Sequence, residues 1–212
     1  MKAFYFKHLL SFHNPSGTSR GILKQKESWF IVIVQGNKTG IGECSLIEGL
    51  SPDPVKSYEQ ILKTVCENIS DGFENLSLKL NSFPSILFGL ETAFRSFESH
   101  DPLLLFPSAF TKNKDSIAIN GLIWMGEKNF MISQIKEKIN AGFDCIKIKI
   151  GSLDFKTELD IIKNIRKEYS LKNLEIRVDA NCAFAFSEAL EKLKKLSDFS
   201  IHSIEQPIQT RQ

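Results

Sequence analysis

Two lysines, Lys147 and Lys149, alternate with isoleucines in a β-like run of the sequence. Successive side chains of a strand point to opposite faces, so both amines are expected on one face, about 6.6 Å apart. The next two β-like runs carry Arg177 and Asp179, and then Glu205, in the same phase. Charges that point into the interior of a fold are costly without a partner or an ion. The set therefore predicts a functional site rather than a solvated strand edge.

These residue types suit the metal-assisted removal of a proton. Asp179 and Glu205 offer the hard oxygen ligands that Mg²⁺ prefers. Lys149 is the predicted base, because the positive charges of Lys147 and of the metal favour its neutral amine. The metal would stabilise the enediolate that forms when a carboxylate substrate loses its α-proton. The sequence thus predicts an enzyme that acts on a small carboxylate, with Mg²⁺ as cofactor.

Short strands that alternate with helices are predicted to position these groups. The predicted strands cover 116–120, 144–150, 174–179 and 201–205, and the predicted helices cover 127–141, 154–169 and 187–196. The strand ends recur roughly every 30 residues, which is typical of βα units in a barrel or a doubly wound sheet. Asn120, at the first strand end, is predicted to point inward, and Trp124 beyond it to fill space. No glycine-rich fingerprint follows these strands, which argues against dinucleotide binding.

Residues 1 to about 100 predict a separate α+β unit. Its predicted strands cover 3–12, 28–34 and 39–44, and its predicted helices begin near residues 54 and 84 and end near residues 70 and 99. A polar loop around Pro15 and Gly17 is expected between the first two strands. The three strands are expected to form an antiparallel meander.

The composition of the chain argues against several kinds of protein and partner. The chain has 27 basic and 25 acidic residues, a net charge of +2, which argues against nucleic acid as a partner. Its longest strongly apolar run, Trp29 to Val34, is far shorter than the roughly 20 residues that span a membrane. The four cysteines have neither zinc-ligand nor Cys-x-x-Cys spacing and are expected to be reduced in a cytoplasmic protein. A small molecule is therefore the expected partner.

Three motifs at successive strand ends carry a resemblance to a known family. They are Lys147-x-Lys149, Asp179-x-Asn181 and Glu205-Gln206-Pro207. Together they resemble the enolase superfamily, in its muconate-lactonizing-enzyme-like subgroup, whose sites can combine a lysine base with Mg²⁺. The resemblance implies an α+β capping domain, residues 1–112, followed by an α/β TIM-like barrel. Residues 113–212 would form about the first half of that barrel.

Within the superfamily, the chain is most similar to the o-succinylbenzoate synthases of menaquinone biosynthesis. The segments that support this are 16–21, 40–44, 119–126 and 177–181. The resemblance implies a carbon–oxygen lyase that dehydrates 2-succinyl-6-hydroxy-2,4-cyclohexadiene-1-carboxylate. Two alternatives remain. One is a related racemase or epimerase of N-acylamino acids or dipeptides, and the other is an inactive half-barrel that only binds or assembles.

The resemblance also implies a role for each residue of the site. The catalytic residues are Lys149 as the base, Lys147 as its neighbour and Arg177 as a residue that orients or tunes the pair; the metal ligands are Asp179 and Glu205, supported by Asn181; and the substrate contacts are Arg20 and Asn120. Loops at residues 16–20 and 47–52 would close over the substrate and exclude water.

The family pattern continues beyond the residues of this chain. The resemblance implies a fifth strand with a third carboxylate ligand and a sixth strand with an opposing lysine, and no residue up to Gln212 matches them. The sequence therefore predicts a fragment or a prematurely ended gene product, or else a chain that needs a partner for the rest of the barrel. In either case little or no activity is expected of this chain alone. A homo-oligomer is also an expected arrangement.

Overall fold

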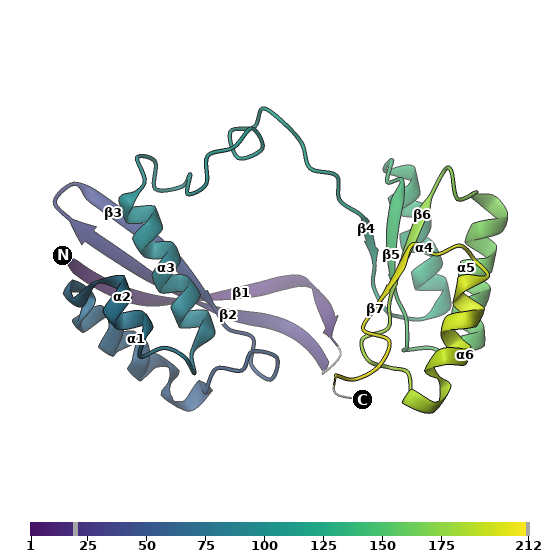
Figure 1. Cartoon of the computed structure of the whole chain (residues 1–212), viewed down its shortest axis with the longest axis horizontal. Coiled ribbons are helices and arrows are strands. Elements are labelled where there is room, and N and C mark those ends of the chain that lie inside the picture. Colours follow the sequence, from purple (N-terminus) through teal and green to yellow (C-terminus); the bar gives the residue numbers. More distant parts are fainter. Residues whose placement is uncertain (19–20, 211–212) are drawn as a thin grey trace. The chain divides into compact units, whose positions relative to one another are not determined.

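The computed structural model describes residues 1–18 and 21–210. By its internal contacts the chain divides into two compact units, Met1–Ser116 and Ile117–Gln212. Each unit has its own sheet and its own hydrophobic core, and Figure 1 labels the elements of both. Among the described residues, no helix is both long and apolar enough to cross a lipid bilayer.

The N-terminal unit is built on a three-stranded antiparallel sheet. Its strands are β1 (Lys2–Thr18), β2 (Gly21–Gln35) and β3 (Lys38–Ser45), in the order β1-β2-β3. The predicted meander is confirmed, since each strand pairs with the next one along the chain.

The hairpin between β1 and β2 is longer than predicted. The polar residues around Pro15 predict a loop, but the backbone of Gly17 pairs with that of Ile22 across the hairpin. The prediction of a loop there is wrong, because a register shift between Ser11 and Ser16 takes up the irregular stretch and lets pairing resume.

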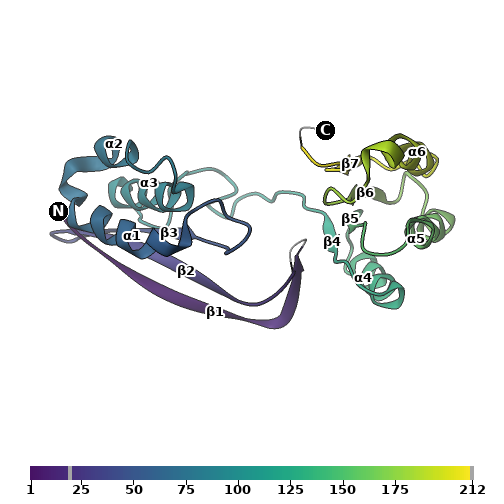
Figure 2. The same cartoon turned by 90° about the horizontal axis from the view of Figure 1, so that it is seen from below.

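Helices cover one face of this sheet, as Figure 2 shows. They are α1 (Tyr58–Glu67), α2 (Gly72–Ser77) and α3 (Pro84–Glu98), with short 3₁₀ turns at Val55–Ser57 and Ile69–Asp71. Alternate residues of β2, Trp29, Ile31 and Ile33, are buried against them. The helix α3 begins at Pro84, where a missing backbone N–H costs no hydrogen bond. The sequence predicts α1 and α3 but not the short helix α2.

The C-terminal unit is a four-stranded parallel sheet with helices on one face (Figure 2). The strands are β4 (Gly121–Ile123), β5 (Cys145–Lys149), β6 (Glu175–Asp179) and β7 (Ser203–Glu205), in the order β4-β5-β6-β7. The helices are α4 (Lys128–Asn140), α5 (Phe155–Glu168) and α6 (Phe186–Ser197). The isoleucines that alternate with the lysines, Ile146 and Ile148, are buried on the helix side. The lysines therefore lie on the opposite face, as their phase predicts.

The first strand of this unit starts later than predicted. Ile117 and Ile119, which alternate as in a strand, are 60% and 71% exposed, and β4 begins only at Gly121. Pairing with β5 begins at Gly121, which lies opposite Ile146. The helix α4 packs closely there, since a Cβ atom at Gly121 would lie 3.0 Å from the Cβ of Lys138. Ile123, fully buried, is the residue of this strand that joins the core.

Arg166 of α5 joins three separate carbonyl groups at the amino-terminal end of the sheet. Its guanidinium donates to the carbonyl oxygens of Leu174 (2.6 Å), Phe199 (2.8 Å) and Ser200 (3.0 Å). Arg166→Ala is expected to lower the free energy of unfolding of this unit by about 2–3 kcal/mol, because it removes hydrogen bonds from a charged donor. Urea unfolding followed by Trp124 fluorescence measures this.

The matched control is Lys163→Ala, which removes an exposed cation from the same helix. It is expected to change the stability by less than about 0.5 kcal/mol. Arg166→Lys keeps the charge but not the planar fork of donors, so it is expected to restore only part of the loss. Equal midpoints for Arg166→Ala and Lys163→Ala would rule out the bridging role.

Candidate active site

The register of the parallel strands brings three predicted site residues to one level. Lys149 is the Cα partner of Asp179, and Asp179 is the partner of Glu205. One layer toward the amino ends of the strands, Lys147 pairs with Arg177 and with Leu122. Because alternate residues of a strand share a face, all these side chains start from the face that the helices leave free.

Asp179 is the centre of the site. Its side chain is only 5% exposed, and its Oδ2 atom lies 3.3 Å from the Nζ atom of Lys149 and 3.4 Å from that of Lys147. Its other oxygen, Oδ1, accepts a hydrogen bond of 3.1 Å from the backbone N–H of Asn181. One nearly buried carboxylate thus serves two ammonium groups and a backbone donor, which offsets the cost of burying its charge.

Lys147 joins Asp179 to the last strand. Its ammonium donates a hydrogen bond to Oε2 of Glu205, whose side chain is about half exposed. This hydrogen bond raises the pKa of Lys147, with a further contribution from the charge of Asp179, while burial opposes the shift. A raised pKa means that the folded protein keeps Lys147 protonated, and the stability from this ion pair is lost as the pH rises through that pKa.

Lys149 has a different environment. Besides Asp179, its ammonium has Oδ1 of Asn181 at 3.3 Å and lies 5.6 Å from the ring centroid of Trp124. An ammonium over an indole face is attracted by the ring quadrupole. Trp124, predicted to fill space at the barrel mouth, therefore also contacts the predicted base. It follows β4 directly, which places it at the end of the sheet where Lys149 lies.

Asn181 carries an unused hydrogen-bond donor. Its Nδ2 atom is buried and, within the described part of the chain, has no hydrogen-bond partner. Buried amide groups are nearly always paired, so an unpaired one at a charged site indicates a missing acceptor. An oxygen atom of a bound carboxylate would satisfy it.

The turns that follow β6 and β7 hold an uncommon backbone conformation. Asn181, Cys182 and Gln206 have φ values of +46°, +62° and +43°. The two turns remain bonded to each other, because the N–H of Cys182 donates to the carbonyl of Gln206 at 2.7 Å. Left-handed backbone at residues other than glycine is uncommon and concentrates at functional sites, where the surrounding structure imposes it.

Comparison with known proteins now adds to this geometry. A family model described as "Enolase C-terminal domain-like" matches residues 131–212. The o-succinylbenzoate synthase of Desulfotalea psychrophila is 37% identical over the whole chain, which covers 66% of that protein. The chain belongs to the enolase superfamily.

Solved structures of the superfamily share the fold. MenC from Desulfotalea psychrophila, 32% identical, matches all of the chain with a TM-score of 0.84 over 65% of its own length. A dipeptide epimerase from Enterococcus faecalis, solved with Mg and the dipeptide L-Leu-L-Tyr, is 19% identical and matches 99% of the chain with a TM-score of 0.77 over 61% of its own length. The chain thus spans slightly less than two thirds of the length of each of these relatives.

The other predicted site residues lie elsewhere. Arg177 is on the same face as the lysines, but its ion pair is with Glu175, at 2.6 Å. Asn120 immediately precedes β4 instead of ending a strand, and Leu122 is the β4 residue that lies beside Lys147. This corrects the predicted placement of Asn120. Arg20 lies outside the described residues.

The oxygen atoms of the site fit the Mg²⁺ ion that sites of this superfamily employ. The described residues contain no group of three or more His, Cys, Asp or Glu side chains that would hold an ion unaided. Mg²⁺, however, is usually bound by one or two carboxylates, with water and substrate oxygens in its other positions. Asp179 and Glu205 supply two such carboxylates, both of which contact the ammonium of Lys147.

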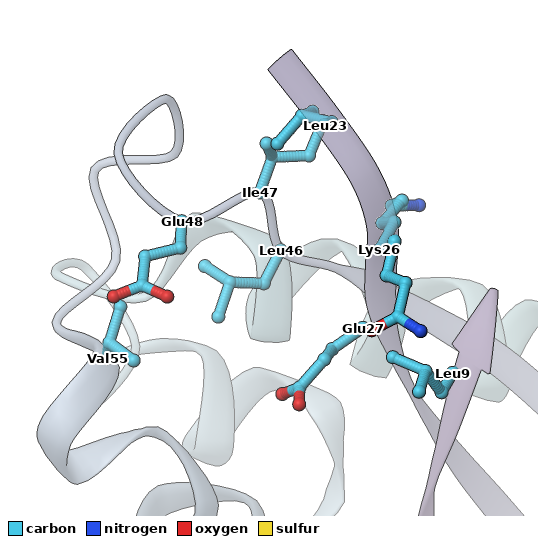
Figure 3. A pocket seen from close by; sticks show the side chains of 9 residues that line it. Leu9, Leu23, Lys26, Glu27, Leu46, Ile47, Glu48 and Val55 are labelled. Carbon is cyan, nitrogen blue, oxygen red and sulfur yellow. The ribbon is translucent and has the colours of Figure 1, made fainter. Parts of the chain in front are cut away.

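The N-terminal unit has a hollow of its own. Its volume is about 240 Å³, and Figure 3 shows it between the hairpin strands and the segment that follows β3. The residues that line it are Leu9, Leu23, Gln25, Lys26, Glu27, Leu46, Ile47, Glu48 and Val55. Ile47 and Glu48 belong to the loop that the sequence predicts to close over a substrate.

Proposed function

We propose that this site belongs to an o-succinylbenzoate synthase, a lyase that dehydrates 2-succinyl-6-hydroxy-2,4-cyclohexadiene-1-carboxylate with Mg²⁺. The observation that carries the proposal is the contact of both lysines with Asp179, beside Glu205, in a chain 37% identical to such a synthase.

The parallel sheet with helices on one face supports a second proposal, which concerns the domains. The C-terminal unit forms the first half of a TIM-like barrel, and the N-terminal unit forms its capping domain.

In this proposal Lys149 moves the proton. As a neutral amine it takes the proton next to the substrate carboxylate, and the electron pair of that C–H bond is delocalised into the carboxylate. The pair then forms the ring C=C bond as the C–O bond to the neighbouring hydroxyl group breaks, and Lys149 returns its proton to the departing oxygen, which leaves as water. One group at one position thus serves both as base and as acid.

The other residues bind and orient. Lys147, kept protonated by Glu205 and Asp179, supplies a fixed positive charge beside Lys149. The free Nδ2 donor of Asn181 is suited to an oxygen atom of the substrate carboxylate. Asn120 and Arg20 are proposed as further contacts of the substrate. Arg177 is proposed to tune the lysine pair from the layer below.

Asp179 and Glu205 would hold the Mg²⁺ ion. A divalent cation at this place supplies positive charge that stabilises the negative charge left by proton removal.

Ligand binding tests the proposal without a need for turnover. Isothermal titration calorimetry with the product, o-succinylbenzoate, is expected to detect binding in the presence of Mg²⁺ and none when EDTA removes the ion. Binding of equal strength with and without Mg²⁺ would contradict the proposed site. A chain that shows no binding and no stabilisation by Mg²⁺ would match the third possibility, an inactive half-barrel.

An epimerase of dipeptides is the second candidate. It is supported by the fold shared with the dipeptide epimerase of Enterococcus faecalis, and its chemistry also begins with removal of an α-proton. If a hydrophobic dipeptide binds with Mg²⁺ and o-succinylbenzoate does not, this candidate replaces the first.

A further inference from the structure

Glu158, in the first turn of α5, closes the loop that follows β5. Its side chain is nearly buried, at 2% exposure of the residue. Its Oε1 atom accepts hydrogen bonds from three successive backbone N–H groups, those of Gly151 (2.6 Å), Ser152 (3.1 Å) and Leu153 (3.1 Å). Three successive backbone donors form a concave site of the kind that binds anions, and here an internal carboxylate fills it.

This loop is packed directly against the turn after β6. Gly151, with φ of +97°, has space only for a hydrogen atom, since a Cβ atom there would lie 2.3 Å from the Cβ of Ala183 and 3.1 Å from the carbonyl oxygen of Ala180. Lys149 lies two residues before Gly151, and Asn181 lies between the two alanines. The loop that Glu158 holds therefore adds a contact between the segment that carries Lys149 and the turn that carries Asn181, next to the pairing of β5 with β6.

The carboxylate is held at an electrostatic cost. Burial raises the pKa of Glu158, and the three backbone hydrogen bonds reduce that shift without cancelling it. The nearby charge of Asp154 adds to the cost. Among the described residues, the ion pairs of the unit involve other carboxylates, so no cation offsets the burial of this one. Its three backbone hydrogen bonds are thus the interactions that hold this carboxylate in place.

We infer that Glu158 is a positioning residue of the site. It fixes the loop at 151–153, and the contact of Gly151 with residues 180–183 transmits that constraint to the turn after β6. The Nζ atom of Lys149 and the Oδ1 atom of Asn181 are thereby kept 3.3 Å apart. The inference rests on the proposed function, since it assigns Glu158 to the same site.

The test compares three variants. Glu158→Ala removes the acceptor, and Glu158→Gln keeps an oxygen acceptor without the charge. Asp154→Ala removes the N-terminal cap of the same helix, where Oδ1 of Asp154 accepts from the N–H of Thr157 at 3.0 Å, and leaves the loop contacts intact. It is the control for a purely structural loss, because a lost cap destabilises the helix by itself.

Two readouts are measured on the whole chain. Amide hydrogen exchange of residues 180–183 is expected to become at least about tenfold faster in Glu158→Ala, and Mg²⁺-dependent binding of o-succinylbenzoate about tenfold weaker or more, as for residues that support a metal site. Glu158→Gln is expected to recover most of both, and Asp154→Ala to lower the melting temperature while changing neither.

The outcomes separate the two ideas. If Glu158→Ala lowers the melting temperature as Asp154→Ala does, but leaves exchange at 180–183 at the wild-type rate, the positioning role is wrong. If the wild-type chain binds no ligand with Mg²⁺, the proposed function is wrong, and the exchange rates still decide whether Glu158 acts on the turn.

Discussion

Substitution of Gly42 by alanine is expected to unfold the N-terminal unit. In the structure α3 lies so close to β3 that a Cβ atom at Gly42 would be 1.9 Å from the carbonyl oxygen of Gly89 and 2.7 Å from the backbone N of Ala93. Gly89 in turn faces Cys44 across the same contact, where its own Cβ atom would be 2.3 Å from Sγ. Backbone atoms cannot yield as a side chain does, so the helix would have to leave the sheet. The expected cost is at the upper end of the overpacking range, about 3 kcal/mol or more.

The two tryptophans make this measurable, because each unit contains one of them. Trp29 is buried in the N-terminal core, and Trp124 is in the C-terminal unit. In Gly42→Ala the fluorescence of Trp29, observed alone in a Trp124→Phe background, is expected to shift to that of a solvated indole. Thr39→Ala, at an exposed position of the same strand, is the control and should leave both signals unaltered. A native Trp29 signal in Gly42→Ala would contradict the close packing of α3.

The second large effect is expected for Asp179→Asn, which should abolish stabilisation by Mg²⁺. A ligand at 100 times its dissociation constant stabilises a protein by about 2.7 kcal/mol. Asparagine keeps the shape of the side chain but lacks the charge that attracts the cation, and it no longer neutralises the ammonium groups of Lys147 and Lys149, 3.4 and 3.3 Å away. Loss of this ligand should weaken Mg²⁺ binding more than about 100-fold, beyond the effect of losing a supporting residue.

Thermal unfolding with and without Mg²⁺ measures this effect. The control is Asp144→Asn, an exposed carboxylate just before β5, at the opposite end of the strands. It should show the same Mg²⁺-dependent rise in melting temperature as the wild type. If Mg²⁺ raised the melting temperature of Asp179→Asn by as much as that of the wild type, Asp179 would be excluded as a metal ligand.

The repeating α/β pattern of the second unit is readable from the sequence because each strand has an isoleucine or valine that packs on the core, buried in β4, β5 and β6 and half-buried in β7. The strands β5, β6 and β7 and the helices between them fall within a few residues of their predicted ranges. The first strand does not, because Ile117 and Ile119 alternate as the residues of a strand do, whereas β4 is only three residues long, Gly121–Ile123. The start of the strand is set by a tertiary contact, the pairing of Gly121 with Ile146 of β5, which the local pattern does not contain.

In the site, too, the local sequence pattern predicts some features and tertiary contacts decide the others. Strand phase predicts that Lys147, Lys149, Asp179 and Glu205 share one face, and the structure brings their charged groups together. Their catalytic roles stay predictions. The hydrogen bonds of Glu158 to the loop at 151–153 cannot be predicted from the sequence in this way. A glutamate in the first turn of a helix is usually solvent-exposed, and only the folded loop supplies its three donors.

The strand order β4-β5-β6-β7 also has a consequence for how the chain folds during synthesis. Each strand pairs with the next one in the sequence, so every pairing joins segments about 30 residues apart and none waits for a distant part of the chain. Ribosomal synthesis delivers these segments in the order in which they pair, at a pace slower than the closure of such short connections. The unit is therefore expected to gain protection from proteases one βα segment at a time, as ribosome-bound chains of increasing length would reveal.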